Sequence, residues 1–284
     1  MTITAAHRVN ADLHCHSRVS DGTLEPGDVA RRAHEHAVEL WALTDHDEVA
    51  GQSEAFAAAL ALGMPCIAGV EISVSWAEHT LHIVGLGIDP YSEELIDGLA
   101  RTRNSRDRRA RDMSDQLAAV GIPGCYEGAL ALAGNPDMIA RTHFGRYLVE
   151  QGVCADIKDV FSRFLVEGKP GYIPMNWGTL GNAIDWIGHA GGVAVLAHPA
   201  RYKLTDLQRD ALLDEFKQRG GRAIEIVSGS HTVDDARFYT DVARHYGLRG
   251  SRGSDFHSPG EGNAEFGSLP ALPESVVPVW VDWI

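Results

Sequence analysis

Short apolar runs alternate with helical patterns along most of this chain. Apolar or alternating runs typical of strands lie at 12–14, 40–44, 65–70, 80–87, 193–197, 223–227 and 248–250. Helical spacing of apolar residues occupies 26–36, 49–62, 180–190, 206–219 and 233–246. Strands that are apolar throughout are typical of a parallel sheet covered by helices. Repeated strand–helix units over 284 residues therefore predict an α/β fold of the barrel type.

Residues 105–170 interrupt this rhythm. The stretch 93–120 is helical and rich in arginine, and shorter helical patterns follow at 140–150 and 156–165. Turn-forming glycine and proline residues separate these patterns. We therefore predict a small helical domain, residues 105–170, inserted into one barrel domain that is formed by residues 1–104 and 171–284.

Composition and charge narrow the range of partners. The formal net charge of −14 argues against long duplex DNA, because a broad basic face is needed to neutralise its phosphates. The 4 cysteines are scattered without a Cys-x-x-Cys pair, which is typical of a reduced compartment. The sequence shows no apolar run of about 18 residues and no signal-peptide pattern, so we expect a cytoplasmic protein that binds no membrane. Most of the 25 basic residues are arginine, whose planar group suits phosphate.

Histidines and carboxylates recur at the ends of the predicted strands. His14 and His16 are two residues apart after the first strand, so the strand period places both side chains on one face. The full set of candidates is His14, His16, Asp21, His46, Glu71, His82, His198, Asp255 and His257. In a closed barrel the carboxyl ends of the strands share one rim, so we expect these side chains to converge there.

These residue types predict a metal centre. Imidazole and carboxylate ligands without a thiolate suit zinc, manganese, iron or cobalt. Taken singly, His82 also fits an ordinary core or surface histidine, and Asp21 fits a turn residue. Together the candidates exceed the needs of two ions, and a bridging Glu71 would let them hold three. We expect His14, His16, Glu71 and Asp255 to hold the first ion, Glu71, His82 and His198 the second, and Asp21, His46 and His257 the third.

Five motifs carry a resemblance to a known family. They are His14-Cys15-His16, Thr44-Asp45-His46-Asp47, Gly69-Val70-Glu71, His198-Pro199 and Ser254-Asp255-Phe256-His257. As a set they resemble the PHP (polymerase and histidinol phosphatase) family. The resemblance implies a distorted (β/α)7 barrel, a trinuclear metal centre and phosphoester hydrolysis. Manganese is the ion that we expect.

A narrower resemblance concerns the inserted helices. Residues 11–51 and the segment Arg141-Thr142-His143-Phe144-Gly145-Arg146 resemble the branch of the family with an inserted helical domain. That branch contains 3′,5′-nucleoside bisphosphate phosphatases and related 5′→3′ oligoribonucleases. It implies a small phosphorylated nucleotide as substrate, with removal of the 3′-phosphate to give the 5′-monophosphate, or alternatively a short RNA. The sequence carries no expectation about the oligomeric state.

Roles follow for two sets of residues. We expect Glu71, His14, His198 and Asp255 to be catalytic. We expect the substrate to be bound by Arg141, His143, Asn176 and Arg201, with Trp177 as a further contact or a core residue. The arginine run at 101–111 is more typical of a solvated helix face than of a binding site.

Other activities remain open on the sequence. An amidohydrolase barrel that cleaves C–N bonds also begins with a strand-borne His-x-His. Such enzymes commonly use a carboxylated lysine as the bridging ligand, whereas the lysines of this chain fall on predicted helices or loops. A metal-stabilised module without activity is a further alternative.

Overall fold

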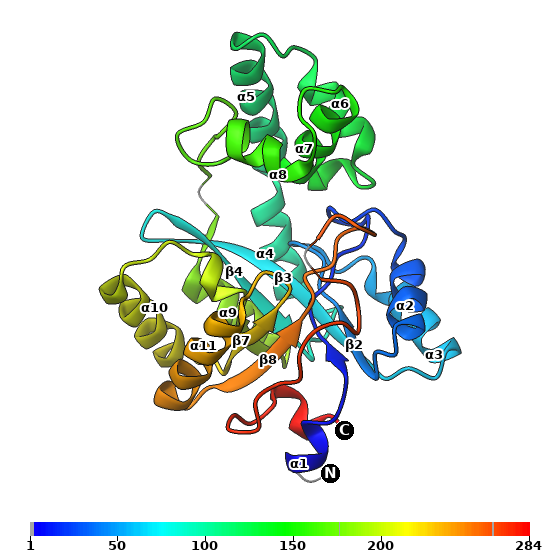
Figure 1. The fold of residues 1–284 in the computed structure, drawn as a ribbon, viewed down its shortest axis with the longest axis vertical. Helices are drawn as coiled ribbons and strands as arrows, with labels where there is room; N and C mark the ends of the chain where they lie inside the picture. The colour runs from blue at the N-terminus through cyan, green and yellow to red at the C-terminus, as the bar shows by residue number, and fades with distance from the viewer. Residues whose placement is uncertain (1–2, 176, 263) are drawn as a thin grey trace.

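The computed structural model describes residues 3–175, 177–262 and 264–284. Its centre is a sheet in which seven strands follow one path and curl into a nearly closed barrel (Figure 1). In sheet order these are β1 (Ala11–Asp12), β2 (Leu40–Leu43), β3 (Cys66–Trp76), β4 (His79–Leu86), β6 (Val193–Leu196), β7 (Ala223–Ser228) and β8 (Arg249–Gly253). A short strand off this path, β5 (Gly178–Thr179), pairs with β3. The predicted α/β barrel is confirmed.

The barrel closes between its first and last strands. The amide of Leu13 donates to the carbonyl of Arg252 at 3.0 Å, and the amide of Asp255 donates to the carbonyl of His14 at 2.8 Å. These bonds continue the ladder beyond β1 and β8. They bring His14, near the start of the chain, beside Asp255, near its end.

The sheet is not wholly parallel, and in this respect the prediction was wrong. β4 runs antiparallel to both β3 and β6. Only Ala77 and Glu78 separate β3 from β4, and their φ values of 43° and 68° are those of a tight hairpin turn. Two residues are too few for the crossover that parallel strands need. β3 also continues to Trp76, so Glu71 lies inside a strand and not at its end as expected.

Helices cover the outside of the barrel. They are α2 (Pro26–Glu35), α3 (Gln52–Ala61), α4 (Glu93–Arg103), α9 (Leu180–His189), α10 (Asp206–Gln218) and α11 (Val233–Tyr246). All but α4 agree with a predicted helix to within a few residues at their ends. The stretch predicted as helical over 93–120 is instead divided after Arg103, and its second part belongs to the inserted helices. Because helices lie outside and side chains fill the interior, every residue of β2 and of β7 is buried.

A group of helices stands apart from the barrel at the top of Figure 1. Its members are α5 (Arg106–Ala119), α6 (Cys125–Leu132), α7 (Arg141–Glu150), α8 (Ile157–Val160) and the π-helical turn η2 (Phe161–Leu165). These helices share a hydrophobic core of their own, which includes Met113, Leu117, Phe144, Leu148 and Val160. A separate core supports the inserted domain that we propose for residues 105–170.

The two ends of the chain lie side by side below the barrel (Figure 1). The first helix, α1 (Ile3–Ala6), lies against the C-terminal turn η4 (Val279–Asp282), and Trp280 Nε1 donates to the Ala6 carbonyl at 3.0 Å. Within the described ranges, no helix combines the length and the apolar character that crossing a membrane would require.

Candidate metal centre

Glu71 lies at the centre of the predicted ligand set. It is fully buried in the middle of β3, inside the barrel. Its Oε2 atom lies 3.2 Å from His14 Nε2 and 3.3 Å from His16 Nε2. The same oxygen is 3.0 Å from His46 Nδ1. One carboxylate oxygen therefore faces imidazoles from two separate segments of the chain.

The first predicted ligand group is brought together. Asp255 Oδ1 lies 3.2 Å from His16 Nε2 and 3.5 Å from His14 Nε2. One ligand atom from each of these three residues and from Glu71 lies within 4.8 Å of the others. The grouping follows from barrel closure, which sets the segment after β1 beside the segment after β8.

The residues predicted for the third ion also meet. Asp21 Oδ1 lies 3.3 Å from His257 Nε2 and 3.9 Å from His46 Nε2. The ring of His16 stacks between these two imidazoles, with centroids 4.1 Å from that of His257 and 4.4 Å from that of His46. The structure therefore adds His16 to the predicted group, and all four ligand atoms lie within 4.8 Å of one another.

The second predicted group uses the other oxygen of Glu71, but the ligand atoms that lie within 4.8 Å of one another are those of His46, Glu71 and His82. Glu71 Oε1 lies 2.9 Å from His82 Nδ1 and 3.0 Å from His198 Nε2. His82 on β4 pairs with Ser73, two positions beyond Glu71, so the side chains of Glu71 and His82 point to the same face of the sheet. The hairpin that the sequence did not predict is therefore what places His82 in the site.

The donor atoms fit metal ions. Buried polar atoms without a hydrogen-bond partner include His14 Nε2, His16 Nδ1, Asp21 Oδ1, His46 Nδ1, Glu71 Oε2 and His82 Nδ1. Buried polar atoms are normally paired, because leaving them unpaired costs free energy. Divalent cations satisfy imidazole nitrogens and carboxylate oxygens together. The residues present thus suit a cluster of such ions.

Burial and charged neighbours shift the pKa values of these imidazoles in different directions. Burial alone would lower the pKa of His14, but the surrounding carboxylates, led by Glu71, outweigh it and hold that pKa well above the ordinary value. The carboxylates of Asp255 and Glu71 likewise outweigh burial and raise the pKa of His16 to about 10. Burial, reinforced by the neighbouring Arg201 guanidinium, lowers the pKa of His198 to about 4. Neutral imidazole is the form that binds a metal. Burial alone would raise the pKa of Glu71, but the nearby imidazoles, led by His14, outweigh it and hold that pKa well below its usual range. The site therefore combines ionised carboxylates with a neutral His198, and a divalent cation would supply the positive charge that protons on His14 and His16 otherwise supply.

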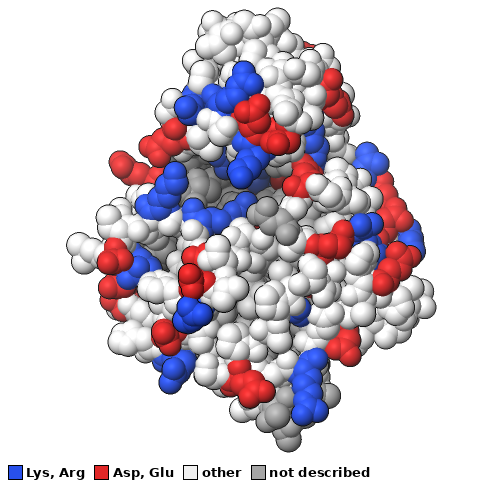
Figure 2. All heavy atoms as spheres, in the orientation of Figure 1, with Lys and Arg blue, Asp and Glu red and all other residues white. Residues whose placement is uncertain are grey.

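A cleft of about 400 Å³ opens above these ligands, between the barrel and the inserted helices. Figure 2 shows basic side chains gathered around this hollow. Its lining includes Arg106, Arg109, Arg141, Arg201, Phe161, Val166, Trp177 and Tyr202. The site thus has acidic and imidazole groups at its floor and guanidinium groups in its walls. A negatively charged ligand is suited to this arrangement.

The interpretation of the arginine run at 101–111 as a solvated helix face was only partly correct. Arg101, Arg108 and Arg111 are exposed, as expected of a solvated face. Arg106 is instead buried, forms an ion pair with Asp47 and lies 4.7 Å from the centroid of the Trp177 ring. The spacing of three residues along the helix carries Arg109 to the same side, into the cleft.

Two of the four predicted substrate contacts, Arg141 and Arg201, line the cleft. Arg141 lines the cleft at the start of α7, and its guanidinium carbon lies 5.7 Å from the Phe161 ring centroid. Arg201 also lines the cleft, and its Nη1 donates to Asp255 Oδ2 at 2.6 Å. His143 is fully buried, and its Nδ1 accepts the Ala140 amide at 3.0 Å. His143 is thus in the wall behind the cleft, and Asn176 lies outside the described residues.

Sequence reasoning missed the buried carboxylate of Glu225. Its Oε1 lies 2.7 Å from His14 Nδ1, and its Oε2 accepts the amide of His198. The available signal was a charged residue within the apolar strand Ala223–Ser228. Asp45, which belongs to the motif Thr44-Asp45-His46-Asp47, accepts the Ser17 amide at 2.8 Å and so holds the loop that leads to Asp21.

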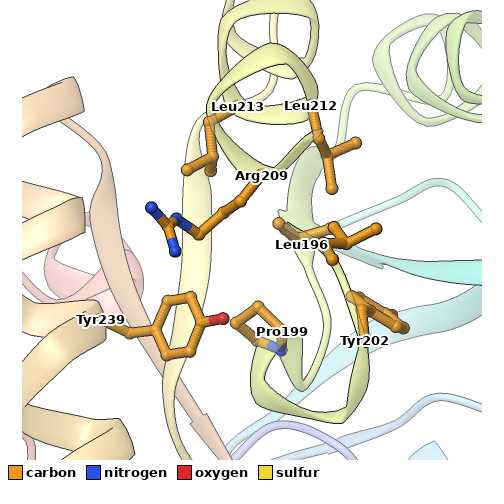
Figure 3. Close-up of a pocket in the computed structure, with 8 residues that line it drawn as sticks. Leu196, Pro199, Tyr202, Arg209, Leu212, Leu213 and Tyr239 are labelled. Atoms are coloured by element: carbon orange, nitrogen blue, oxygen red, sulfur yellow. The ribbon is translucent and has the colours of Figure 1, made fainter. Parts of the chain in front are cut away.

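A small cavity of about 40 Å³ lies behind the loop that follows β6. Figure 3 shows the hydroxyl of Tyr239 pointing toward Pro199 of this loop, with Arg209 above them and Tyr202 on the far side of Pro199. Tyr202 also accepts the amide of His82 at 2.9 Å, so the loop is tied to β4. Leucines, Pro199, two tyrosines and Arg209 line the cavity, and none of the candidate metal ligands does. The cavity therefore lies beside the ligand site without belonging to it.

Comparison with known proteins adds independent information. The family model described as PHP domain matches residues 12–167. A 3′,5′-nucleoside bisphosphate phosphatase of Chromobacterium violaceum is 49% identical over 271 residues, which cover 95% of each chain. The chain belongs to the PHP domain family. A 5′-3′ exoribonuclease Rnm of Escherichia coli is 40% identical over 276 residues, covering 96% of this chain and 93% of the relative.

Solved structures of the family share the fold. A protein from Chromobacterium violaceum described as an amidohydrolase, with bound sulfate, superposes with a TM-score of 0.93 at 48% identity, covering 96% of this chain and 95% of the other. A putative metal-dependent phosphoesterase from Bifidobacterium adolescentis has a TM-score of 0.79 at 29% identity, covering 94% and 92% of the two chains. The predicted family, barrel fold and enzyme class, a phosphoric ester hydrolase, are thereby confirmed.

Proposed function

We propose that this PHP family enzyme removes the 3′-phosphate from 3′,5′-nucleoside bisphosphates, giving the nucleoside 5′-monophosphate and phosphate. The nine predicted metal ligands, called the ligand cage below, lie at the floor of an arginine-lined cleft, and this position is the observation that carries the proposal. Such a cleft presents cation sites to one phosphate and guanidinium groups to another. The C. violaceum bisphosphate phosphatase, similar over 95% of its length, supports the same substrate class.

The cage would hold divalent ions, and three per chain is the number that its grouping supports. His14, His16, Glu71 and Asp255 would hold the first ion, and Asp21, His46 and His257 the third, with His16 close to that group. Glu71, His82 and His198 would hold the second ion, because both imidazoles lie within 3.0 Å of Glu71 Oε1, and His46 is also close to this group. Manganese is our preferred ion, and zinc, iron and cobalt suit the same donors. Such ions, when bound, activate water and neutralise phosphate oxygens.

The chain's own residues position the reacting phosphate. In hydrolysis, water adds to phosphorus, the bond from phosphorus to the 3′-oxygen breaks, and that oxygen gains a proton. We assign catalytic roles to Glu71, His198 and Asp255, because they line the floor of the cleft, and to His14, because its Nε2 lies 3.2 Å from Glu71 directly behind that floor. Arg201 donates to Asp255 Oδ2 at the rim of the cleft and is placed to donate a further hydrogen bond to a phosphate oxygen.

The second phosphate and the nucleoside would lie against the walls of the cleft. Arg141 begins a ten-residue helix, so its guanidinium and the helix N-terminus both favour an anion. Trp177, beneath Arg106, offers an aromatic face for a base or ribose. Asn176 keeps its predicted role as a substrate contact within this proposal. His143, which is buried and accepts the Ala140 amide, would instead support the start of α7 from behind the cleft wall. We also keep a cytoplasmic location as a proposal.

Hydrolysis of short 5′-phosphorylated RNA from the 5′ end is the second candidate. The E. coli exoribonuclease Rnm, 40% identical over 96% of this chain, favours it. Both substrates are short nucleotides with a terminal phosphate, so one cleft could serve both. Cleavage of C–N bonds is disfavoured, because Glu71 would take the place of a bridging lysine and none of Lys158, Lys169, Lys203 and Lys217, all within the described ranges, lines the cleft.

A phosphate-release screen with added Mn²⁺ tests these assignments. The panel contains adenosine 3′,5′-bisphosphate, adenosine 3′-monophosphate, 5′-phosphorylated RNA of two to five nucleotides, and a set of amides. We expect the bisphosphate to have the highest kcat/KM. Faster release of nucleotides from RNA would favour the second candidate, and turnover of amides alone would contradict the proposal.

A further inference from the structure

A single carboxylate contacts ligands from two different groups of the cage. Glu225 lies on β7 and is 1% exposed. Its Oε1 is 2.7 Å from His14 Nδ1, and its Oε2 accepts the backbone amide of His198. Since Glu225 does not line the cleft, it cannot touch a substrate there. Its two oxygens instead contact His14 and His198, two of the predicted metal ligands.

The contact with His14 determines which ring nitrogen faces the cage. When Nδ1 carries the proton and donates it to Glu225, the lone pair of Nε2 points to the other side of the ring. Nε2 is the atom that lies 3.2 Å from Glu71 and 3.5 Å from Asp255. Glu225 thus selects the tautomer of His14 that a metal ligand requires.

The contact with His198 holds an unusual backbone conformation. His198 has φ of 25° and ψ of 57°, a region that non-glycine residues seldom adopt. Its amide donates to Glu225 at this bend, and its Nε2 then reaches Glu71 Oε1 at 3.0 Å. Such conformations persist when the surroundings over-determine them. The carboxylate is one of the groups that do so here.

A break in the sheet register coincides with Glu225. Glu225 pairs with Ser251 and Val227 with Arg252, so the intervening Ile226 is an extra residue relative to β8. Bulges of this kind re-aim side chains and are frequent beside active sites. The irregularity suggests that the direction in which the Glu225 side chain points is important, because a residue that only packs in the core would not require a bulge.

We propose that Glu225 is a positioning residue that couples the first and second ion sites, by fixing the His14 tautomer with one oxygen and the His198 bend with the other. The inference rests on the metal centre proposed above. A glutamine at this position would fill the same volume but could accept only one of the two N–H groups. Its amide nitrogen would meet the other as donor against donor.

The test compares the wild type with Glu225→Gln, and Glu225→Asp serves as a second variant that shortens the reach. Each metal-free protein is titrated with Mn²⁺ by calorimetry, bound metal is counted, and the melting temperature of the metal-free form is measured. We expect about 10- to 100-fold weaker binding of the first and second ions, the range typical of lost outer-shell partners, with the third retained. Glu215→Gln, whose carboxylate accepts the Trp76 indole on the outside of the barrel, is the matched control and should bind metal as the wild type does.

The outcomes separate the two proposals. Weakened metal binding with an unchanged metal-free melting temperature supports a positioning role. Wild-type affinity and stoichiometry in both Glu225 variants would overturn it, whether or not the variants melt earlier, because Glu225 would then be merely structural. A wild-type chain that binds no divalent ion would instead overturn the metal centre itself.

Discussion

The hydroxyl of Thr142, in the first turn of α7, donates a 2.7 Å hydrogen bond to Asp21 Oδ2 in the loop after β1. The other oxygen of the same carboxylate faces His257 and His46. Arg146, one turn further along α7, donates to the Asp21 carbonyl at 2.6 Å. The inserted helices therefore contact the third ligand group directly, and we expect them to influence metal binding as well as substrate binding.

Replacing Thr142 tests this link. Thr142→Val keeps the shape of the side chain and removes the hydroxyl that orients Asp21. Loss of such an outer partner typically weakens metal binding by about 10- to 100-fold, and we expect that loss for one ion. Calorimetric titration with Mn²⁺ measures it. Thr142→Ser keeps the hydroxyl and should resemble the wild type; equal losses in both variants would show that the hydrogen bond to Asp21 is not the cause.

Chelation should abolish phosphatase activity. The proposed mechanism depends on ions held by imidazole and carboxylate groups, and these groups alone supply no activated water. Exhaustive dialysis against a chelator should therefore reduce phosphate release to background, and Mn²⁺ should restore it. The control is a melting curve showing that the chelated protein is still folded. Activity that persists in folded, metal-free protein would rule out the mechanism.

Arg141 should distinguish substrates by their second phosphate. Arg141→Ala removes a charged donor from the cleft wall, and a hydrogen bond to a charged group contributes about 1.5–3 kcal/mol. We therefore expect kcat/KM for a 3′,5′-bisphosphate to fall roughly 10- to 100-fold. The value for an aryl phosphate should change little. Arg111→Ala, at an exposed position of α5 that pairs with Asp107, is the control. Equal losses on both substrates would mean that Arg141 does not read the second phosphate.

Arg106 should matter for folding stability. Its guanidinium pairs with Asp47, and both side chains are buried. Arg106→Met would leave the carboxylate of Asp47 without its cation, and breaking a buried pair typically costs about 3–5 kcal/mol. Urea denaturation measures the loss in free energy of unfolding. Asp47→Asn combined with Arg106→Met should recover part of it, because no buried charge then stays unpaired; no recovery would point to lost packing on Trp177.

His143 should make the protein less stable in acid. Burial lowers the pKa of His143 to about 4, with the neighbouring Arg146 adding to the shift against the opposing charge of Asp21. An unfolded imidazole has a pKa of about 6.5. As the pH falls from about 6.5 to 4, the unfolded state gains a proton that the folded state does not, so stability falls by on the order of 3 kcal/mol.

His143→Asn should remove that dependence. The asparagine oxygen can take over the role of Nδ1 in accepting the Ala140 amide. Free energies of unfolding of the two proteins, measured from pH 4 to 7, should differ most near neutral pH and converge or cross in acid. A constant difference across this range would show that His143 does not titrate below its ordinary pKa on folding.

Much of the architecture follows from local patterns in the sequence. The helices Asp206–Gln218 and Val233–Tyr246 begin at Thr205 and Thr232, each with a capping box, and apolar spacing predicts their length. The chemical character of the site is also visible, since histidines and carboxylates such as His14 and Asp255 stand directly after strands. Their convergence in the structure agrees with that reading, while their role as metal ligands stays a proposal.

Other features depend on which segments meet. No local pattern shows that β4 turns back along β3, although the hairpin is what brings His82 to Glu71. The arginines of α4 and α5 look alike in sequence, yet only the position of α5 over Trp177 makes Arg106 a buried residue and leaves Arg108 exposed. Likewise a glutamate in an apolar strand has no evident partner until His14 and His198 are placed beside it.

The sequence by itself determined the strand–helix rhythm, the set of candidate ligands and the family, because periodicity, capping and side-chain chemistry are properties of short segments. Only the tertiary structure decided the direction of β4, the sharing of Glu71 among imidazoles, the burial of Arg106 and the partners of Glu225. These depend on distances between residues far apart in the chain. Such distances are set by how the whole barrel closes and where the inserted helices rest upon it.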